Sequence, residues 1–265
     1  RRPHPLQGEG LLLDGIRLVF GTAMVVSIVL SLAAILRRDV ARHRAWMIRG
    51  YAIGLGSLEI ALERLLGELD ARIHFQPFEL NPRMGPLGQD IAEHLTQKYG
   101  SSPQQQAATR EMIRQRGAEV GFEFRPQGRD RIYNTFDAHR LLHWAHEEGR
   151  PDGGVDAPGQ QRLLKKALFV AYFTEGRSPA SHEVLVDAAQ AAGLDADRAR
   201  EVLSSGEYAG QVREREEFWR ERDIHAVPAI VIDDTHLVSG GQPPEVFERI
   251  LRKLAERRRE AGSDA

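Results

Sequence analysis

The sequence contains no cysteine in its 265 residues. A chain without thiols forms no disulfide, and it carries no CxxC redox centre, cysteine-ligated zinc, iron–sulfur cluster or thiol nucleophile. The usual sequence clue to redox compartment is missing as well. Thiol chemistry at this protein would therefore require a thiol supplied by another molecule.

An excess of charge of either sign is also lacking. Lys and Arg together number 36 and Asp and Glu 38, so the formal net charge is -2. Nucleic-acid-binding domains are usually strongly basic or carry a basic face, so no nucleic-acid partner is expected. Aromatic residues make up only 7% of the chain, whereas the hydrophobic content of 42% is ordinary for a globular protein. The length suits about two domains.

Charge is absent altogether from one long apolar run, residues 18–36. As a helix this run would extend about 28 Å, close to the roughly 30 Å of a bilayer's hydrocarbon core. The run therefore predicts a transmembrane helix, with a buried core helix or a secretory h-region as the alternatives. More arginines follow the run than precede it, which by the positive-inside rule predicts a cytoplasmic location for the downstream part.

A distinctive stretch, HRAWMIRGY (43–51), follows this apolar run. It is similar to a loop-to-helix junction in a bacterial family of small multi-pass membrane proteins of unknown function. The similarity covers residues 11–54 and implies no chemistry. We therefore assign residues 1–54 to a membrane-protein-like segment.

From residue 55 the sequence has the character of a soluble domain. Ser57 is placed to cap a helix with one apolar face, and the apolar–polar alternation over 72–78 predicts a half-buried strand. Further helices are predicted on either side of a Gly/Pro-rich loop at 149–161, over residues 102–117, 135–148, 161–174, 181–192, 195–204 and 207–222.

The pattern changes again near residue 229. Two short strands, 229–232 and 236–238, precede an amphipathic helix over 244–260. The domain thus begins with a helix and a strand, continues with a helical block, and ends with two strands and a helix. This order predicts an α/β domain with a mixed sheet. In this domain an all-helical insertion over about 86–222 interrupts the sheet.

Five short motifs stand out in this domain: FQPFELNP (75–82), NTFDAHR (134–140), KALFVAYF (166–173), AVPAIVI (226–232) and VSGGQP (238–243). In this order they resemble the DsbA-like thioredoxin-fold family. The similarity is to its FrnE-type branch, which neighbours 2-hydroxychromene-2-carboxylate isomerases and kappa-class glutathione transferases. It covers residues 55–265 and implies a thioredoxin-like fold with thiol–disulfide oxidoreductase ancestry.

The resemblance places the family's cis-proline at Pro228. Its turn would leave the backbone of Val227 free to pair with an extended peptide by strand addition, whereas a trans proline entering an ordinary strand is the alternative. Other substrate-binding positions that the resemblance implies are Asn81, Pro82, His139, Gly241 and Gln242. Asn81 and Pro82 could instead form a simple turn.

The family's redox centre is missing. The resemblance puts its two cysteine positions at Ile48 and Tyr51, so no catalytic residue is assigned. The family's first strand would fall at about 38–46, between the strands at 72–78 and 229–232, but the charges there could not line a buried strand. The sheet would thus lack its middle, and we infer a fusion or rearrangement junction near Gly50.

The sequence contains few other candidate catalytic or metal-binding groups. His139, His143 and His146 share one helix face with Glu147 nearby, but exposed histidines need no special cause, so no metal site is predicted. In relatives that use glutathione, a loop such as 240–242 at a helix N-terminus would receive a carboxylate of the cofactor. A serine can activate the glutathione thiol in such relatives, but Ser57 lies too far along its helix for that role.

Three functions stay open on the sequence. The chain is a DsbA-like oxidoreductase by descent without a redox centre, a glutathione-dependent transferase or isomerase, or a non-catalytic peptide-binding module tethered to a membrane. The predicted partner is accordingly an extended peptide or glutathione in the cis-proline groove, with a membrane reached through the N-terminal helix. The predicted location is a membrane, with the second domain in the cytoplasm, or the cytoplasm alone if residues 1–54 are a junction artefact.

Overall fold

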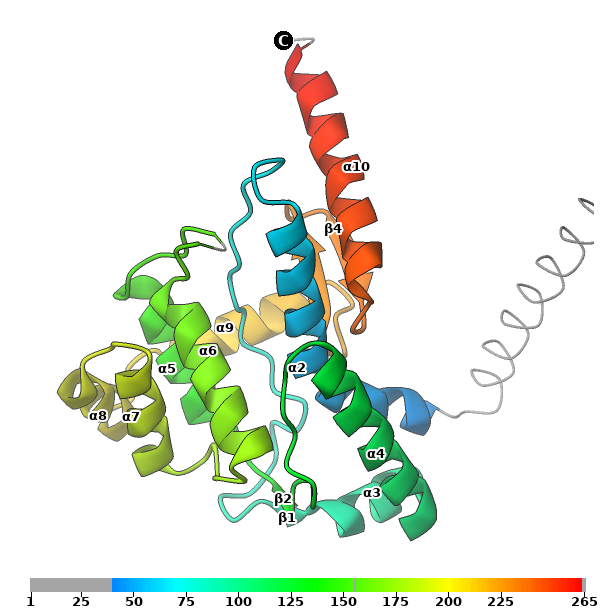
Figure 1. Ribbon diagram of the computed structural model, residues 1–265. Helices are drawn as coiled ribbons and strands as arrows, with labels where there is room; N and C mark the ends of the chain where they lie inside the picture. The colour runs from blue at the N-terminus through cyan, green and yellow to red at the C-terminus, as the bar shows by residue number, and fades with distance from the viewer. Residues whose placement is uncertain (1–39, 155, 264–265) are drawn as a thin grey trace, which may run out of the picture. The chain divides into compact units, whose positions relative to one another are not determined.

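The computed structural model describes residues 40–154 and 156–263 (Figure 1). The apolar run at 18–36, where the sequence predicts a transmembrane helix, lies outside these residues. Among the helices that are described, none is both long and apolar enough to cross a bilayer. From Ala45 onward the described residues form one compact unit.

Helices dominate this unit and its strands are short. In chain order the elements are α2 (Val40–Arg64), β1 (Gln89–Asp90), α3 (Ile91–Tyr99), α4 (Pro103–Glu119), β2 (Arg131–Ile132), α5 (Phe136–Glu147), α6 (Gln160–Phe169), the π-helical turn η1 (Val170–Thr174), α7 (His182–Ala191), α8 (Ala196–Ser204), α9 (Ala209–Arg220), β3 (Ala229–Ile232), β4 (His236–Ser239) and α10 (Pro244–Ser263). The predicted helices of the insertion and the predicted terminal hairpin and helix are thereby confirmed.

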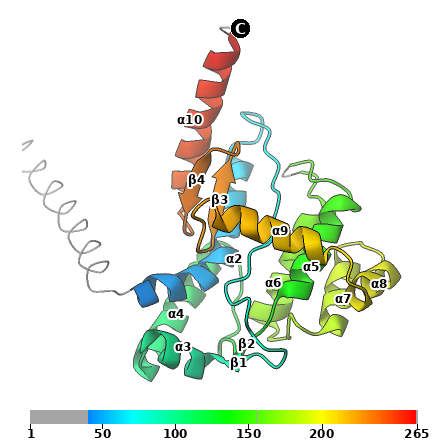
Figure 2. The same cartoon turned by 180° about the vertical axis from the view of Figure 1, so that it is seen from behind.

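The hairpin of β3 and β4 is antiparallel, with Ala229 opposite Ser239 and Ile232 opposite His236. Residues 233–235 form its loop, in which Asp233 and Asp234 both have positive φ and Thr235 N donates to Ile232 O at 3.2 Å. The hairpin, α2 and α10 share an apolar cluster in which Phe247 of α10 is fully buried. Figure 2 shows the two strands beside α10.

Helix α2 corrects one prediction. Ser57 is not a helix cap, because α2 runs without a break from Val40 to Arg64 and Ser57 lies buried in its interior. The apolar stripe of α2 begins before Ser57, with Ala52 and Leu55 already in the core, so nothing stops the helix at this position.

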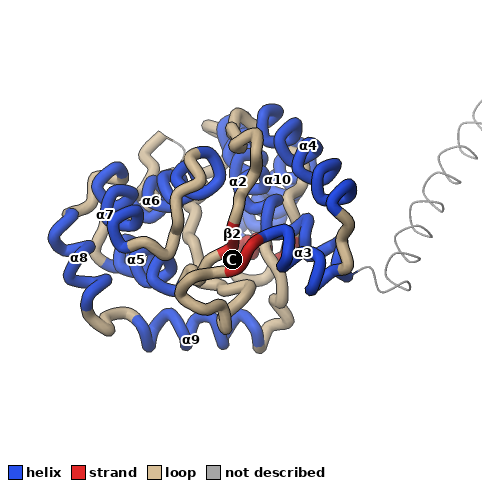
Figure 3. The backbone as a smooth tube through the Cα atoms, turned by 90° about the horizontal axis from the view of Figure 1, so that it is seen from below, coloured by secondary structure: helices blue, strands red, loops and turns tan. Residues whose placement is uncertain are grey.

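The insertion has a core of its own, built by α5, α6, α7 and α8, in which Leu141, Leu164 and Leu185 are fully buried. Helix α9 leads from this group back toward β3 (Figure 2), and Figure 3 shows it extending away from α8. The insertion is not all helical as predicted, because β1 and β2 form a two-residue antiparallel pair. Gly88 permits this pairing, since a Cβ there would lie only 2.1 Å from the carbonyl oxygen of Ile132.

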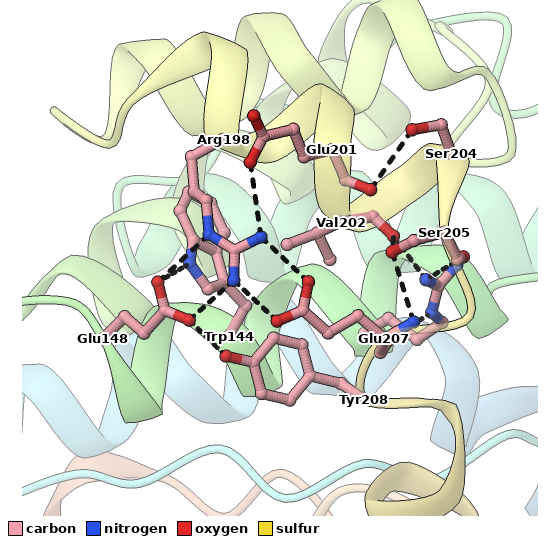
Figure 4. Close-up of polar contacts among 10 residues, drawn as sticks. Trp144, Glu148, Arg198, Glu201, Val202, Ser204, Ser205, Glu207 and Tyr208 are labelled. Atoms are coloured by element: carbon pink, nitrogen blue, oxygen red, sulfur yellow. Dashed lines mark hydrogen bonds and ion pairs between the residues drawn. The ribbon is translucent and has the colours of Figure 1, made fainter.

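An ionic network links several elements of the insertion (Figure 4). Arg198 of α8 donates to Glu148 at 2.8 Å and to Glu207 at 2.6 Å, while Tyr208 and the Trp144 indole donate to Glu148 as well. The network joins the end of α5 to α8 and to the loop that precedes α9.

Residues 72–79, which we call the extended segment, do not form the predicted strand. The expected alternation of burial is present, with Phe75 buried between exposed His74 and Gln76, but no ladder partner is described beside it. The side-chain pattern was therefore predicted correctly and the pairing was not.

Candidate functional site

The positions that the resemblance predicts for the family's redox motif are helical in this chain. Ile48 and Tyr51 both lie within α2, and residues 40–46, where the family's first strand would begin the fold, belong to the same helix. In the part of the chain that the structure describes, no strand takes the central position between the extended segment and β3.

The Val227–Pro228 peptide bond is cis and lies against α2. A Cβ added to Gly54 would come within 3.3 Å of Pro228 Cγ and within 3.3 Å of Gly241 Cα. The structure thus brings Pro228, Gly241 and Gly54 together, and we call this group with Val227 the proline site. The absence of a side chain at Gly54 is what allows the helix to approach so closely.

The loop after β4 is held to the proline site by a main-chain hydrogen bond. Gly240 N donates to the carbonyl oxygen of Pro228 at 2.9 Å. The side-chain amide of Gln242 turns back and donates to Ser239 O at 2.8 Å. Gln242 therefore stabilises its own turn in this structure, and its role toward a substrate stays a prediction.

Side chains of the insertion bond to one edge of the extended segment, where a neighbouring strand would pair in a sheet. Backbone amides of alternate residues donate to side-chain oxygens of the insertion: Ile73 N to Asp152 Oδ2, Phe75 N to Gln161 Oε1 and Glu79 N to Glu216 Oε1, each at 2.9 Å. Gln161 also donates from Nε2 to Phe75 O at 2.9 Å. Amides of alternate residues point to one edge of an extended chain, so the insertion satisfies a single edge of the segment.

A buried ionic cluster fixes the end of the extended segment. Glu79 and Glu216 are 3% and 0% exposed, and both accept hydrogen bonds from Arg213, which also lies over the Phe136 ring at 3.8 Å. Burial raises the pKa of Glu79 despite the bond from Arg213. The shared arginine offsets the repulsion between the two carboxylates and ties the segment to α9.

His139 supports the extended segment from α5. It forms a hydrogen bond with the Phe78 backbone, and burial, followed by the nearby charge of Lys165, lowers the pKa of its imidazole to about 3. Burial also lowers the pKa of Lys165 to about 7, and its ammonium lies 5.8 Å from the Phe75 ring centre. His139 is thus neutral at physiological pH and acts here as a structural support.

Asn81 and Pro82 follow the extended segment and begin a turn, in which Met84 N donates to Asn81 O at 2.9 Å. The Asn81 side chain accepts from Lys98 Nζ of α3 at 2.8 Å. These contacts account for both residues locally, and their role in substrate binding stays a prediction.

The histidines of α5 face different neighbours. His143 packs edge-on to Tyr208 and His146 packs edge-on to His74, while His139 bonds to Phe78. Within residues 40–154 and 156–263, no group of three His, Asp or Glu side chains is arranged to hold a metal ion.

Comparison with known families agrees with this geometry. The model of the DSBA-like thioredoxin domain matches residues 54–252. The chain belongs to this family. A second model, described as a predicted membrane protein (DUF2306), matches residues 4–72 and so overlaps the first over residues 54–72, which begin in the second half of α2.

Two solved structures show the same fold. A probable DsbA oxidoreductase from Streptomyces coelicolor is 33% identical with a TM-score of 0.67, covering 77% of this chain and 84% of that one. A 2-hydroxychromene-2-carboxylate isomerase is 14% identical with a TM-score of 0.55, covering 80% of this chain and 95% of that one. No curated protein matches the sequence.

Sequence reasoning missed the side chains that hold the extended segment, namely Asp152, Gln161 and Glu216. A signal for two of them is present in hindsight. Gln161 shares one helical face with buried Leu164 and Leu168, and Glu216 lies one turn after buried Val212. A polar residue within an apolar stripe indicates a buried hydrogen-bonding partner.

Proposed function

We propose that this DsbA-family domain binds an extended polypeptide by strand addition at the free edge of β3, and that it performs no thiol–disulfide exchange itself. The observation that supports the proposal most is the pairing of β3 with β4 alone among the described strands. An edge strand presents unpaired N–H and C=O groups, which an added strand satisfies.

The surroundings of this edge suit an extended chain. Ile230 and Ile232 contribute to the cluster beneath α2 and α10, so one face of β3 is already packed. At its start stands the cis Val227–Pro228 bond, and the Val227 backbone is the first group we assign to the incoming peptide. The N-terminal segment would tether this module to a membrane.

Thiol–disulfide exchange requires an attacking thiolate, and the sequence contains no cysteine to supply one. The ancestry shared with oxidoreductases would thus persist as a fold and a proline site. Peptide binding without catalysis is compatible with the retained fold and with the retained proline site.

Use of glutathione is the second candidate, because the family resemblance of the sequence extends to relatives that use glutathione. Such an enzyme needs a group that activates the thiol of the cofactor. Ser57, the serine of α2, lies three residues after Gly54 and is only 2% exposed. A bound thiol outside the core would have no access to it, so the peptide proposal is the stronger one.

The test uses the full chain in mild detergent with fluorescent ten-residue peptides that alternate valine with threonine or lysine. We expect saturable binding by fluorescence polarisation. A matched peptide methylated on alternate backbone nitrogens should bind at least about tenfold more weakly, because it keeps the side chains and loses the donors of strand addition.

Two control measurements separate the alternatives. Saturation by millimolar glutathione together with no peptide binding would favour the transferase or isomerase. Insulin reduction that persists after removal of contaminating thiols would overturn the proposal that the chain performs no dithiol chemistry.

A further inference from the structure

A pocket of about 170 Å³ lies between α3, α4 and the loop over 121–130, away from the proline site. Its floor is apolar: buried Leu95, Ile113, Phe124 and Phe173 line it, and the two phenylalanine rings meet edge to face with centroids 5.5 Å apart. An engineered apolar cavity of about 150 Å³ holds one benzene molecule, so the pocket has room for one aromatic ring.

The rim of the pocket is strongly basic. Four arginines line it, Arg110, Arg114, Arg125 and Arg129, against one carboxylate, Glu111. Three of them have partners: Arg114 donates twice to Glu111, Arg125 pairs with Asp130 at 3.2 Å, and Arg129 donates to the Tyr172 hydroxyl at 2.9 Å. With Asp130 included, the rim retains a net charge of about +2, so it favours an anion.

Arg110 is the arginine available to that anion. It forms no hydrogen bond or ion pair with any residue that the structure describes, and its stem lies along the 128 position of the loop. A Cβ at Gly128 would come within 2.8 Å of Arg110 Cδ, and Gly128 has a φ of +75°. A glycine at this position therefore makes room for the arginine beside the pocket.

A buried polar side chain completes the lining. Gln106 is 5% exposed, and the two N–H groups of its Nε2 lie within hydrogen-bond distance of three acceptors, Ala92 O, Thr96 Oγ1 and Ser101 O. Two of these acceptors are carbonyls, which fixes the orientation of the amide. Gln106 thus holds α3 and α4 together at the pocket, so the lining is built on rigid elements.

We propose that this pocket binds a single-ring aromatic carboxylate. The ring would lie on the apolar floor against Phe124 and Phe173, where edge-to-face contacts are favourable. The carboxylate would lie at the rim, where the planar guanidinium of Arg110 matches it with two parallel hydrogen bonds. Neither group of this site belongs to the proline site.

The test is isothermal titration calorimetry of the full chain in mild detergent with benzoate, acetate, benzyl alcohol and inorganic phosphate. We expect benzoate to bind at least about tenfold more tightly than each of the others, because acetate and phosphate lack the ring and benzyl alcohol lacks the charge. Equal affinity for acetate and benzoate, or tighter binding of phosphate, would overturn the proposal.

Two substitutions locate the site. Arg110→Gln should weaken benzoate binding about tenfold or more, because the carboxylate loses its charge-assisted hydrogen bonds, while the exposed control Arg83→Gln leaves it unchanged. Ala107→Leu, at an exposed helical position that lines the pocket, should block the ring and keep the fold, which circular dichroism checks. Undiminished benzoate binding in both pocket variants would place the ligand elsewhere and refute the assignment.

Discussion

At the scale of single residues, burial decides which charges matter. Arg140 is 4% exposed and donates to the carbonyl oxygens of Val202, Ser205 and Glu207, so it satisfies groups at the end of α8 that no helical bond reaches. Arg198, with a side chain 27% exposed, bonds to carboxylates that are more exposed still. Arginine is therefore a buried hydrogen-bond donor at position 140 and a partner in more exposed ion pairs at position 198.

Arg140→Leu should lower the free energy of unfolding by about 3–5 kcal/mol, because it removes the buried donor of the carbonyl oxygens at the end of α8 and the bond from Arg140 to Asp137. Arg198→Leu should lower it by about 1 kcal/mol, and by less in 1 M salt, which screens exposed ion pairs. Urea titration at low and high salt measures both values. A loss for Arg198→Leu equal to that for Arg140→Leu would contradict the role given to burial.

His139 supplies a second prediction at this scale, on pH. Its folded pKa of about 3 lies below the ordinary value of 6.5, so the unfolded chain binds the additional proton between these values. The contribution of His139 to stability is therefore complete above about pH 6.5 and is lost as the pH falls toward 3, by at most about 2 kcal/mol at pH 5.

Urea unfolding at pH 7 and pH 5 measures this loss. His139→Gln should reduce it, because glutamine does not titrate, whereas the exposed control His225→Gln should leave it as in the parent chain. An unchanged loss in His139→Gln would show that the imidazole does not titrate in this window.

At the scale of elements, the extended segment shows what sequence patterns resolve. The helices of the insertion from α4 onward were predicted within a few residues, because their periodicity, caps and breakers are local. The alternation over 72–78 also gave the buried face correctly. Strand pairing could not be predicted from it, because a ladder depends on a distant partner, and here Asp152, Gln161 and Glu216 take the partner's place.

The proline site likewise has parts that could be predicted from the sequence and one part that could not. The motif around Pro228 was recognisable in the sequence, and so was the glycine-rich loop that bonds to it. The close approach of Gly54 was not, since it depends on how α2 packs in three dimensions. The prediction of a helix cap at Ser57 failed for a related reason, because a local capping preference was overridden by an apolar stripe that extends along the whole helix.

Gln161→Leu tests the replacement of a strand by side chains. The substitution keeps the size of a buried residue and leaves the amide and carbonyl of Phe75 unpaired, so we expect a loss of about 2–4 kcal/mol in urea unfolding. Gln104→Leu, at an exposed position of α4, is the matched control and should change stability by less than about 0.5 kcal/mol. A neutral Gln161→Leu would mean that packing alone keeps the segment extended.

At the scale of the whole molecule, the apolar clusters share elements. Helix α2 contributes Ala52 and Leu55 to one cluster and Leu58 and Leu62 to the next, while Ile73 packs against both. Helix α6 likewise joins the core of the insertion to the cluster around Phe169. Cores connected in this way lose their packing together.

We therefore expect one cooperative thermal transition of the full chain in mild detergent, with far-UV and near-UV circular dichroism changing together. Trp144, 3% exposed and bonded to Glu148, is fixed in an asymmetric environment and should contribute to the near-UV signal. A gradual loss of helix without any near-UV signal would indicate a loosely packed helical remnant instead.

The side-chain bonds along the extended segment have one more consequence, for amide hydrogen exchange. In a strand ladder, neighbouring amides open together, because each bond depends on the alignment of the whole partner. The amides of Ile73, Phe75 and Glu79 are instead held by a loop, by α6 and by α9, which are three separately anchored acceptors. Their protection factors should therefore respond one at a time to substitution, so that this segment opens site by site where a paired strand would open as a unit.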